Sequence, residues 1–161
     1  MEETYAVETV MAPLKTPINV LLVEDDPDSA ELTTAQLSEG KLQGIFKIEW
    51  TDKLTTAMTR LAKPGVDVVL LDLGMPELSG YRSHVAIMSV VGKKIPVVIL
   101  TSDDNGVSRH VAIGRGAANY LIKRRASPVE IRMALHDAVL ESNGQLARFS
   151  LHTGSGTWTP I

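Results

Sequence analysis

The sequence predicts an α/β fold, a doubly wound sheet of five parallel strands with helices on both faces. Residues 18–23, 66–71 and 95–100 are short, β-branched apolar runs that do not alternate, as expected for strands buried on both faces. The stretches between them have helical patterns long enough for right-handed crossovers. With 161 residues, 44% of them hydrophobic, the chain can bury one core but leaves little room for a second domain.

Two further strands complete the sheet. The stretch from 44 to 50 alternates, with Phe46 on one face and Lys47 on the other, and this pattern suits a strand near an edge. Residues 118–122 supply the fifth strand.

The first and last helices have clear N-terminal signals. Residues 27–38 begin with a proline at a first-turn position after Asp26, which can serve as the cap. Residues 127–130, Ser-Pro-Val-Glu, have the pattern of a capping box with proline at the first helical position. The last helix then presents an apolar stripe formed by Ile131, Leu135, Ala138 and Val139.

The three helices between them are expected over residues 53–63, 79–91 and 106–115. The third is weak, because Gly106 and Gly114 lower its helix propensity. We therefore expect one unit over residues 18–142, an N-terminal extension over 1–17 and a C-terminal tail over 143–161.

Composition excludes several classes of function. The formal charge of −3 gives the surface no general attraction for nucleic acid or anionic lipid. The absence of cysteine excludes disulfides, thiolate zinc sites and cysteine nucleophiles. The N-terminus lacks a secretory signal, and no stretch approaches the ~18 apolar residues of a membrane span. We expect a cytoplasmic location without membrane attachment.

Polar residues follow four of the predicted strands. The acids 24–26 follow the first strand, Asp72 the third, Thr101 the fourth and Lys123 the fifth. Ligands of doubly wound sheets bind at the carboxyl ends of the strands, so we expect these side chains to meet there.

This set of residues has the parts that phosphoryl transfer requires. Neighbouring carboxylates raise one another's pKa unless a cation joins them, and Mg²⁺ suits one or two carboxylates plus waters and a phosphate oxygen. Lys123 adds an ammonium that can pair with Asp72 or with a phosphoryl oxygen, and Thr101 adds a hydroxyl. Asp72 can then act as a carboxylate nucleophile.

Four stretches resemble the motifs of response-regulator receiver domains, in matching order and spacing. They are Leu-Leu-Val-Glu-Asp-Asp-Pro at 21–27, Val-Leu-Leu-Asp-Leu-Gly-Met-Pro at 69–76 with Gly80, Val-Ile-Leu-Thr-Ser at 98–102 and Tyr-Leu-Ile-Lys at 120–123. The resemblance covers about residues 18–142. It implies a flavodoxin-like sheet with the strand order 2-1-3-4-5.

The resemblance also implies a role for each residue of the acidic site. Asp72 matches the phosphoacceptor, and Asp25 with Glu24 matches the acidic pair that holds Mg²⁺. The main-chain carbonyl of Gly74 matches a further protein ligand to the metal.

Other matched positions concern switching. Thr101 matches the hydroxyl that bonds the phosphoryl group, Tyr120 the aromatic rotamer switch and Lys123 the lysine of the motif. Asp103 matches a position that tunes the access of water. The output surface is then expected on the fourth helix, the fifth strand and the fifth helix.

The implied function is a signalling switch. A histidine kinase or phosphotransfer protein donates the phosphoryl group to Asp72, and the chain signals in trans to a protein effector. It catalyses only its own phosphorylation and dephosphorylation. We expect no DNA-binding domain, because the tails are too short to form one. A homodimer is possible.

Two alternatives remain. Arg124 follows Lys123 where most receivers have a proline in a cis peptide, and we expect a trans peptide here, because a non-proline cis bond costs ~2.5 to 4 kcal/mol. This departure keeps open a degenerate receiver that acts as a phosphorylation-independent interaction module. A phospho-aspartate phosphatase is the other alternative, but it requires a second Asp where this chain has Gly74.

Overall fold

The computed structural model describes residues 17–39, 43–78, 80–102 and 109–144, and the main chain of 149–150 and 159–160. Five parallel strands form one sheet in the order β2-β1-β3-β4-β5, which confirms the predicted flavodoxin-like fold. The strands are β1 (Ile18–Val23), β2 (Phe46–Thr51), β3 (Val68–Leu71), β4 (Val97–Thr101) and β5 (Asn119–Ile122).

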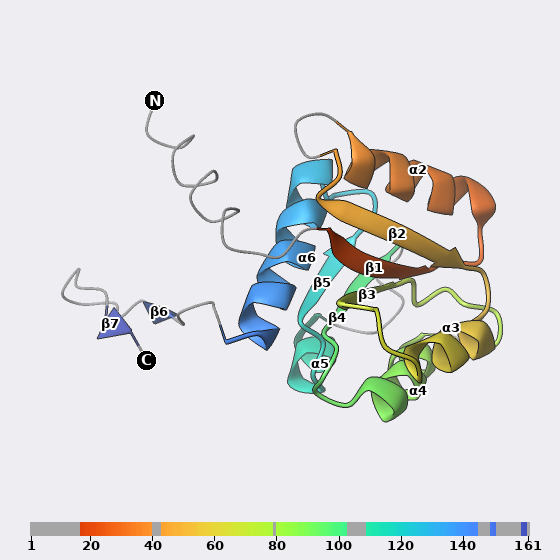
Figure 1. The fold of residues 1–161 in the computed structure, drawn as a ribbon. Helices are drawn as coiled ribbons and strands as arrows, with labels where there is room; N and C mark the ends of the chain where they lie inside the picture. The colour runs from red at the N-terminus through yellow and green to blue at the C-terminus, as the bar shows by residue number, and fades with distance from the viewer. Residues whose placement is uncertain are drawn as a thin grey trace.

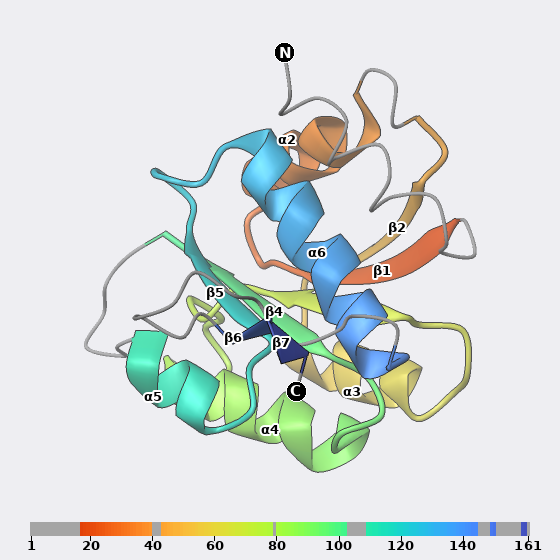
Figure 2. The same cartoon turned by 90° about the vertical axis from the view of Figure 1, so that its left-hand side faces the viewer.

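Helices cover both faces of this sheet. Figures 1 and 2 show α2 and α6 on one face and α3, α4 and α5 on the other, and two separate apolar clusters fill the space between helices and sheet. The helices are α2 (Pro27–Ser38), α3 (Leu54–Leu61), α4 (Tyr81–Val91), α5 (Arg109–Gly114) and α6 (Pro128–Ser142).

Burial of the strands follows the sequence pattern. Every residue of β3 and β4 is buried, as expected for apolar runs that do not alternate. β2 lies at the edge of the sheet, and its Lys47, Glu49 and Trp50 are exposed. The prediction of an edge strand is therefore confirmed.

Four strands, β2 to β5, begin one or two residues later than predicted, and for β3 and β4 the reason can be identified. Asp67 uses its carboxylate to accept a hydrogen bond from the main-chain N–H of Asn19 at 2.7 Å, and β3 begins only at the next residue. Pro96 has no N–H to donate to a neighbouring strand, and β4 begins directly after it.

The predicted caps are present. Asp26 accepts a hydrogen bond from the main-chain N–H of Asp28 at 3.3 Å. Ser127 and Glu130 form the reciprocal capping box, with hydrogen bonds of 2.7 and 3.2 Å. All four members of the apolar stripe on α6 are buried. These local signals fix where the two helices begin.

The helix α5 is described from Arg109 to Gly114, one residue short of the predicted end at residue 115. Its predicted start at residue 106 is not among the described residues and stays a prediction. Residues 103–108, with Asp103 and Gly106, lie outside the described part of the chain.

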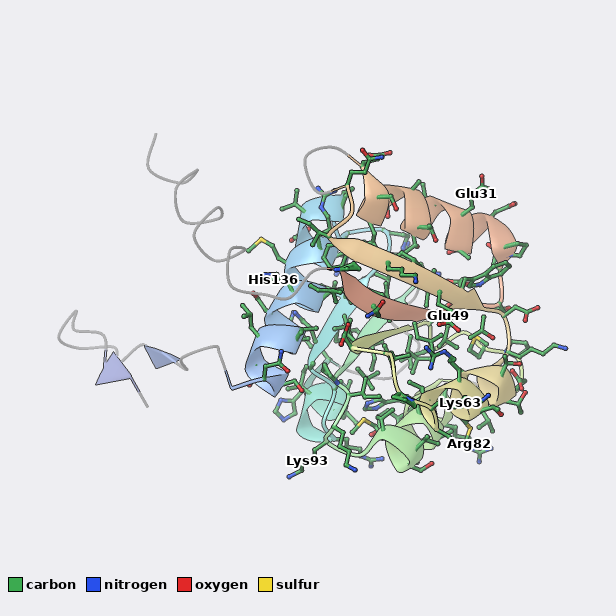
Figure 3. All side chains as sticks on the ribbon, viewed as in Figure 1. Glu31, Glu49, Lys63, Arg82, Lys93 and His136 are labelled. Carbon is green, nitrogen blue, oxygen red and sulfur yellow. The ribbon has the colours of Figure 1, made fainter. Side chains whose placement is uncertain are left out.

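The C-terminal region contains an element that the sequence did not indicate. Residues Phe149–Ser150 (β6) and Thr159–Pro160 (β7) pair as two short antiparallel strands. Most of both tails lies outside the described residues, so the predicted domain boundaries stay a prediction. Within the described residues, no helix has the length and apolarity needed to span a bilayer. Figure 3 shows charged side chains such as Glu31 and Lys93 on the outside of the domain.

Candidate functional site

Main-chain hydrogen bonds continue past the strand ends and fix the residues that follow. The N–H of Glu24 donates to the Thr51 carbonyl at 3.1 Å, and the N–H of Asp72 donates to the Val23 carbonyl at 2.9 Å. These bonds hold both acids at one edge of the sheet.

Three carboxylates gather at this edge. Glu24, Asp25 and Asp72 each offer a carboxylate oxygen, and these atoms lie within 4.8 Å of one another. Glu24 and Asp72 are buried, whereas Asp25 is exposed to solvent. Oxygen ligands that are partly open to water are the donor set that Mg²⁺ prefers, so the residues present fit this ion.

Lys123 reaches the same cluster from β5. Its Nζ lies 3.2 Å from Asp72 Oδ2 and 2.7 Å from Ser29 Oγ, and it forms an ion pair with Glu24 Oε2. The predicted meeting of Lys123 with Asp72 is therefore present, together with two contacts that the sequence analysis did not anticipate.

Burial and the neighbouring charges shift the pKa values of Glu24 and Lys123. Burial raises the pKa of Glu24, and the negative charge of Asp72 raises it further, against the hydrogen bond and charge of Lys123. Burial alone lowers the pKa of Lys123, but the hydrogen bond to Glu24 and the charges of Asp72 and Glu24 outweigh it, so this pKa is raised. The ammonium thus stays charged at neutral pH, and a second cation bound beside Glu24 and Asp72 would reduce the repulsion between their carboxylates.

Gly74 lies directly against the central carboxylate. Its N–H donates a hydrogen bond of 3.0 Å to Asp72 Oδ1. A Cβ at this position would lie 3.5 Å from both carboxylate oxygens of Asp72. The main chain of Gly74 is thus close enough to Asp72 to belong to the same site.

Thr101 and Tyr120 occupy the neighbouring strand ends. Thr101 is buried, and its carbonyl accepts a hydrogen bond of 2.8 Å from the N–H of Lys123. Tyr120 is only 4% exposed and packs in the apolar cluster that contains Ile99. The role of Tyr120 as a rotamer switch stays a prediction.

Two residues of the site were missed by sequence reasoning. The Ser29 hydroxyl donates to Glu24 Oε2 at 3.2 Å, and the Trp50 indole N–H donates to the Glu24 carbonyl at 2.8 Å. Ser29 lies in the first turn of the helix that follows the acidic run, a position that could have drawn attention to it. Trp50 is paired with Leu22 across the sheet, which only the strand register reveals.

The chain matches the response regulator receiver domain over residues 20–136 and belongs to this family. It is 33% identical over 138 residues to the swarming motility regulation protein RssB of Serratia marcescens, a match that covers 86% of this chain and 58% of that protein. The chain therefore spans less than two thirds of that relative's length.

Solved structures show the same fold. A receiver domain from Clostridium thermocellum superimposes with a TM-score of 0.67 at 20% identity, covering 80% of this chain and 98% of that one. The receiver domain of a sensor histidine kinase from Pseudomonas aeruginosa PAO1, with a magnesium ion in its active site cleft, gives 0.62 at 23% identity and covers 75% and 96%.

Proposed function

We propose that this receiver domain is a phosphorylation switch whose acceptor is Asp72. The observation that carries the proposal is the position of the Asp72 carboxylate, between the Lys123 ammonium at 3.2 Å and the acidic residues Glu24 and Asp25. A histidine kinase or phosphotransfer protein is the donor, and the signal passes in trans to a protein effector.

The two oxygens of Asp72 have different surroundings. Oδ1 accepts the N–H of Gly74, and Oδ2 faces the ammonium of Lys123. In the transfer, one Asp72 oxygen forms a bond to phosphorus while the bond between phosphorus and the donor's imidazole nitrogen breaks. Lys123 neutralises charge that spreads over the phosphoryl oxygens. The chain performs this step and the later hydrolysis, in which water attacks phosphorus, the bond between Asp72 and phosphorus breaks, and inorganic phosphate leaves; we propose no other catalysis.

Mg²⁺ fits the acidic side of the site. Glu24, Asp25, Asp72 and the carbonyl of Gly74 are the proposed ligands. When bound, the ion supplies positive charge beside the phosphoryl group. The magnesium ion in the active site cleft of the P. aeruginosa receiver supports this assignment by analogy.

The proposed output face consists of α5, β5 and α6. Thr101 is the residue proposed to move toward the site and to hydrogen-bond a phosphoryl group on Asp72. Tyr120, which is buried in this structure, is the proposed rotamer switch that couples the site to this face. Gly114 lowers the helix propensity of α5, so a shift of this helix should cost little free energy.

The alternative function is an interaction module that needs no phosphorylation. One observation favours it: Arg124 replaces the usual proline, and residues 123–125 form a turn in which the Arg125 N–H donates to the Ile122 carbonyl at 2.9 Å. The loop that carries Lys123 therefore differs from that of most receivers. Both alternatives share the same fold.

Binding of beryllofluoride, a phosphoryl mimic, distinguishes the two functions. We expect Mg²⁺-dependent binding by calorimetry in the wild type and in Asp52→Asn, an exposed acid after β2, and its loss in Asp72→Asn and Asp25→Ala. Failure of the wild type to bind supports the interaction module. Unchanged beryllofluoride binding in Asp72→Asn would show that the phosphoryl mimic binds at another residue.

A further inference from the structure

We propose that Ser29 is a positioning residue for phosphorylation: its hydroxyl fixes the direction in which the Lys123 ammonium faces Asp72. The inference rests on the proposed function of Asp72. It deepens that function by assigning a residue of α2 to the chemistry at the ends of β3 and β5.

The contacts of Ser29 define a relay. Lys123 Nζ donates to Ser29 Oγ at 2.7 Å, and the Ser29 hydroxyl donates onward to Glu24 Oε2 at 3.2 Å. The hydroxyl accepts one hydrogen bond from Lys123 and donates one to Glu24, so it acts as both acceptor and donor. It therefore joins Lys123 to Glu24 by a second route beside their direct ion pair.

Ser29 is not needed as the cap of its own helix. Asp26 occupies the N-cap position, and its side chain accepts the N–H of Asp28. The helix places Ser29 rigidly, because the next residue, Ala30, is only 2% exposed in the core under α2. The hydroxyl thus projects into the site from a fixed backbone.

The ammonium of Lys123 has three N–H groups, and the site offers three acceptors: Glu24, Ser29 and Asp72. With two N–H groups bonded to Glu24 and Ser29, the third N–H faces Asp72. It can then donate to an oxygen of a phosphoryl group on Asp72 while the other two hydrogen bonds stay in place. Without the hydroxyl, one N–H loses its acceptor and the ammonium turns about its remaining partners. A misdirected charge stabilises the transferring phosphoryl group less well.

The same helix supplies a matched control. Ser38 is an exposed serine at the other end of α2, and its hydroxyl donates to the Thr34 carbonyl at 2.8 Å. Ser38→Ala makes the same chemical change at a distance from the site. Ser29→Thr retains the hydroxyl and serves as the rescue variant.

Intact-mass spectrometry with acetyl phosphate and Mg²⁺ gives the rate of phosphorylation. We expect Ser29→Ala to slow it about fivefold, the size of effect expected from one hydrogen bond. Ser29→Thr and Ser38→Ala should remain within about twofold of the wild type. In a Lys123→Ala background, Ser29→Ala should have no further effect, because it acts through the missing ammonium. If Lys123→Ala reacts too slowly for its rate to be measured, the affinity for beryllofluoride is compared instead. It is then measured in the wild type, in Ser29→Ala, in Lys123→Ala and in the double variant.

A second readout needs neither metal nor phosphodonor. In metal-free protein, the side-chain ammonium of Lys123 should give a slowly exchanging ¹H–¹⁵N signal that is shifted or lost in Ser29→Ala and kept in Ser38→Ala.

The outcomes distinguish failure of the role of Ser29 from failure of the proposed phosphorylation of Asp72. A wild-type rate and an unchanged ammonium signal in Ser29→Ala overturn the role of Ser29, as does an equal slowing with and without Lys123. If the wild type itself takes up no phosphoryl group, the proposed function fails, and the positioning role fails with it.

Discussion

The indole N–H of Trp50 donates a hydrogen bond of 2.8 Å to the main-chain carbonyl of Glu24. Trp50 lies on the edge strand β2 and is 46% exposed, whereas Glu24 is buried in the acidic cluster. The bond links a fluorescent side chain directly to the backbone of a proposed metal ligand.

Mg²⁺ should therefore change the fluorescence of Trp50. Binding shifts the main chain around Glu24 and so alters the hydrogen bond and the surroundings of the indole. A titration should show the change in the wild type and in Trp158→Phe, which removes the other tryptophan of the chain. The same change in Trp50→Phe contradicts this assignment.

Glu77 should stabilise the start of α3. The helix has Lys53 at its N-cap without a side-chain cap, and the Glu77 carboxylate accepts the N–H groups of Leu54 and Thr55 instead. Glu77→Ala should lower the free energy of unfolding by about 1 kcal/mol, and Glu77→Gln by less, because it keeps an acceptor oxygen.

Urea denaturation and exchange of the Leu54 and Thr55 amides measure this effect. The control is Glu31→Ala on the exposed side of α2, labelled in Figure 3, which should leave the exchange of both amides unchanged. Equal destabilisation by both alanine variants, with no local change in exchange, argues against the cap.

His84 should make stability depend on pH. Its ring is fully buried in α4, neither ring nitrogen has a hydrogen-bond partner in the described part of the chain, and burial lowers its pKa from 6.5. The unfolded chain therefore binds a proton that the folded chain does not. The stability that comes from keeping His84 neutral is fully present above about pH 6.5. It is lost as the pH falls toward the pKa of His84 in the folded chain, by at most ~1.4 kcal/mol per pH unit.

His84→Phe tests the sign of this dependence. The variant keeps a buried ring beside Tyr81 and removes both unpaired nitrogens, so the slope of unfolding free energy against pH should become smaller. It should not vanish, because burial also lowers the pKa of His136 on α6. An unchanged slope in His84→Phe contradicts the account.

The sheet could be predicted because its signals are local. Uninterrupted apolar runs mark strands buried on both faces, and the capping box at Ser127 fixes a helix start without reference to the rest of the chain. The acids and Lys123 could be placed together because parallel strands end at one edge. The C-terminal end of the fourth helix, at Gly114, lies within one residue of the prediction, because glycine has a low helix propensity.

The contacts of Ser29 and Trp50 were beyond sequence reasoning for a different reason. Each depends on a side-chain direction and on the register between elements far apart in sequence, 94 residues in the case of Ser29 and Lys123. The burial of Tyr120 is likewise a matter of packing, which residue type alone does not determine.

The location of the phosphoryl group tests the central claim most directly. Wild-type protein, Asp72→Asn and Asp52→Asn are incubated with acetyl phosphate and Mg²⁺, and their intact masses are compared with those of metal-free samples. We expect one phosphoryl group, dependent on Mg²⁺, on the wild type and on Asp52→Asn, and none on Asp72→Asn. The same Mg²⁺-dependent product on Asp72→Asn would contradict the assignment of Asp72 as the acceptor.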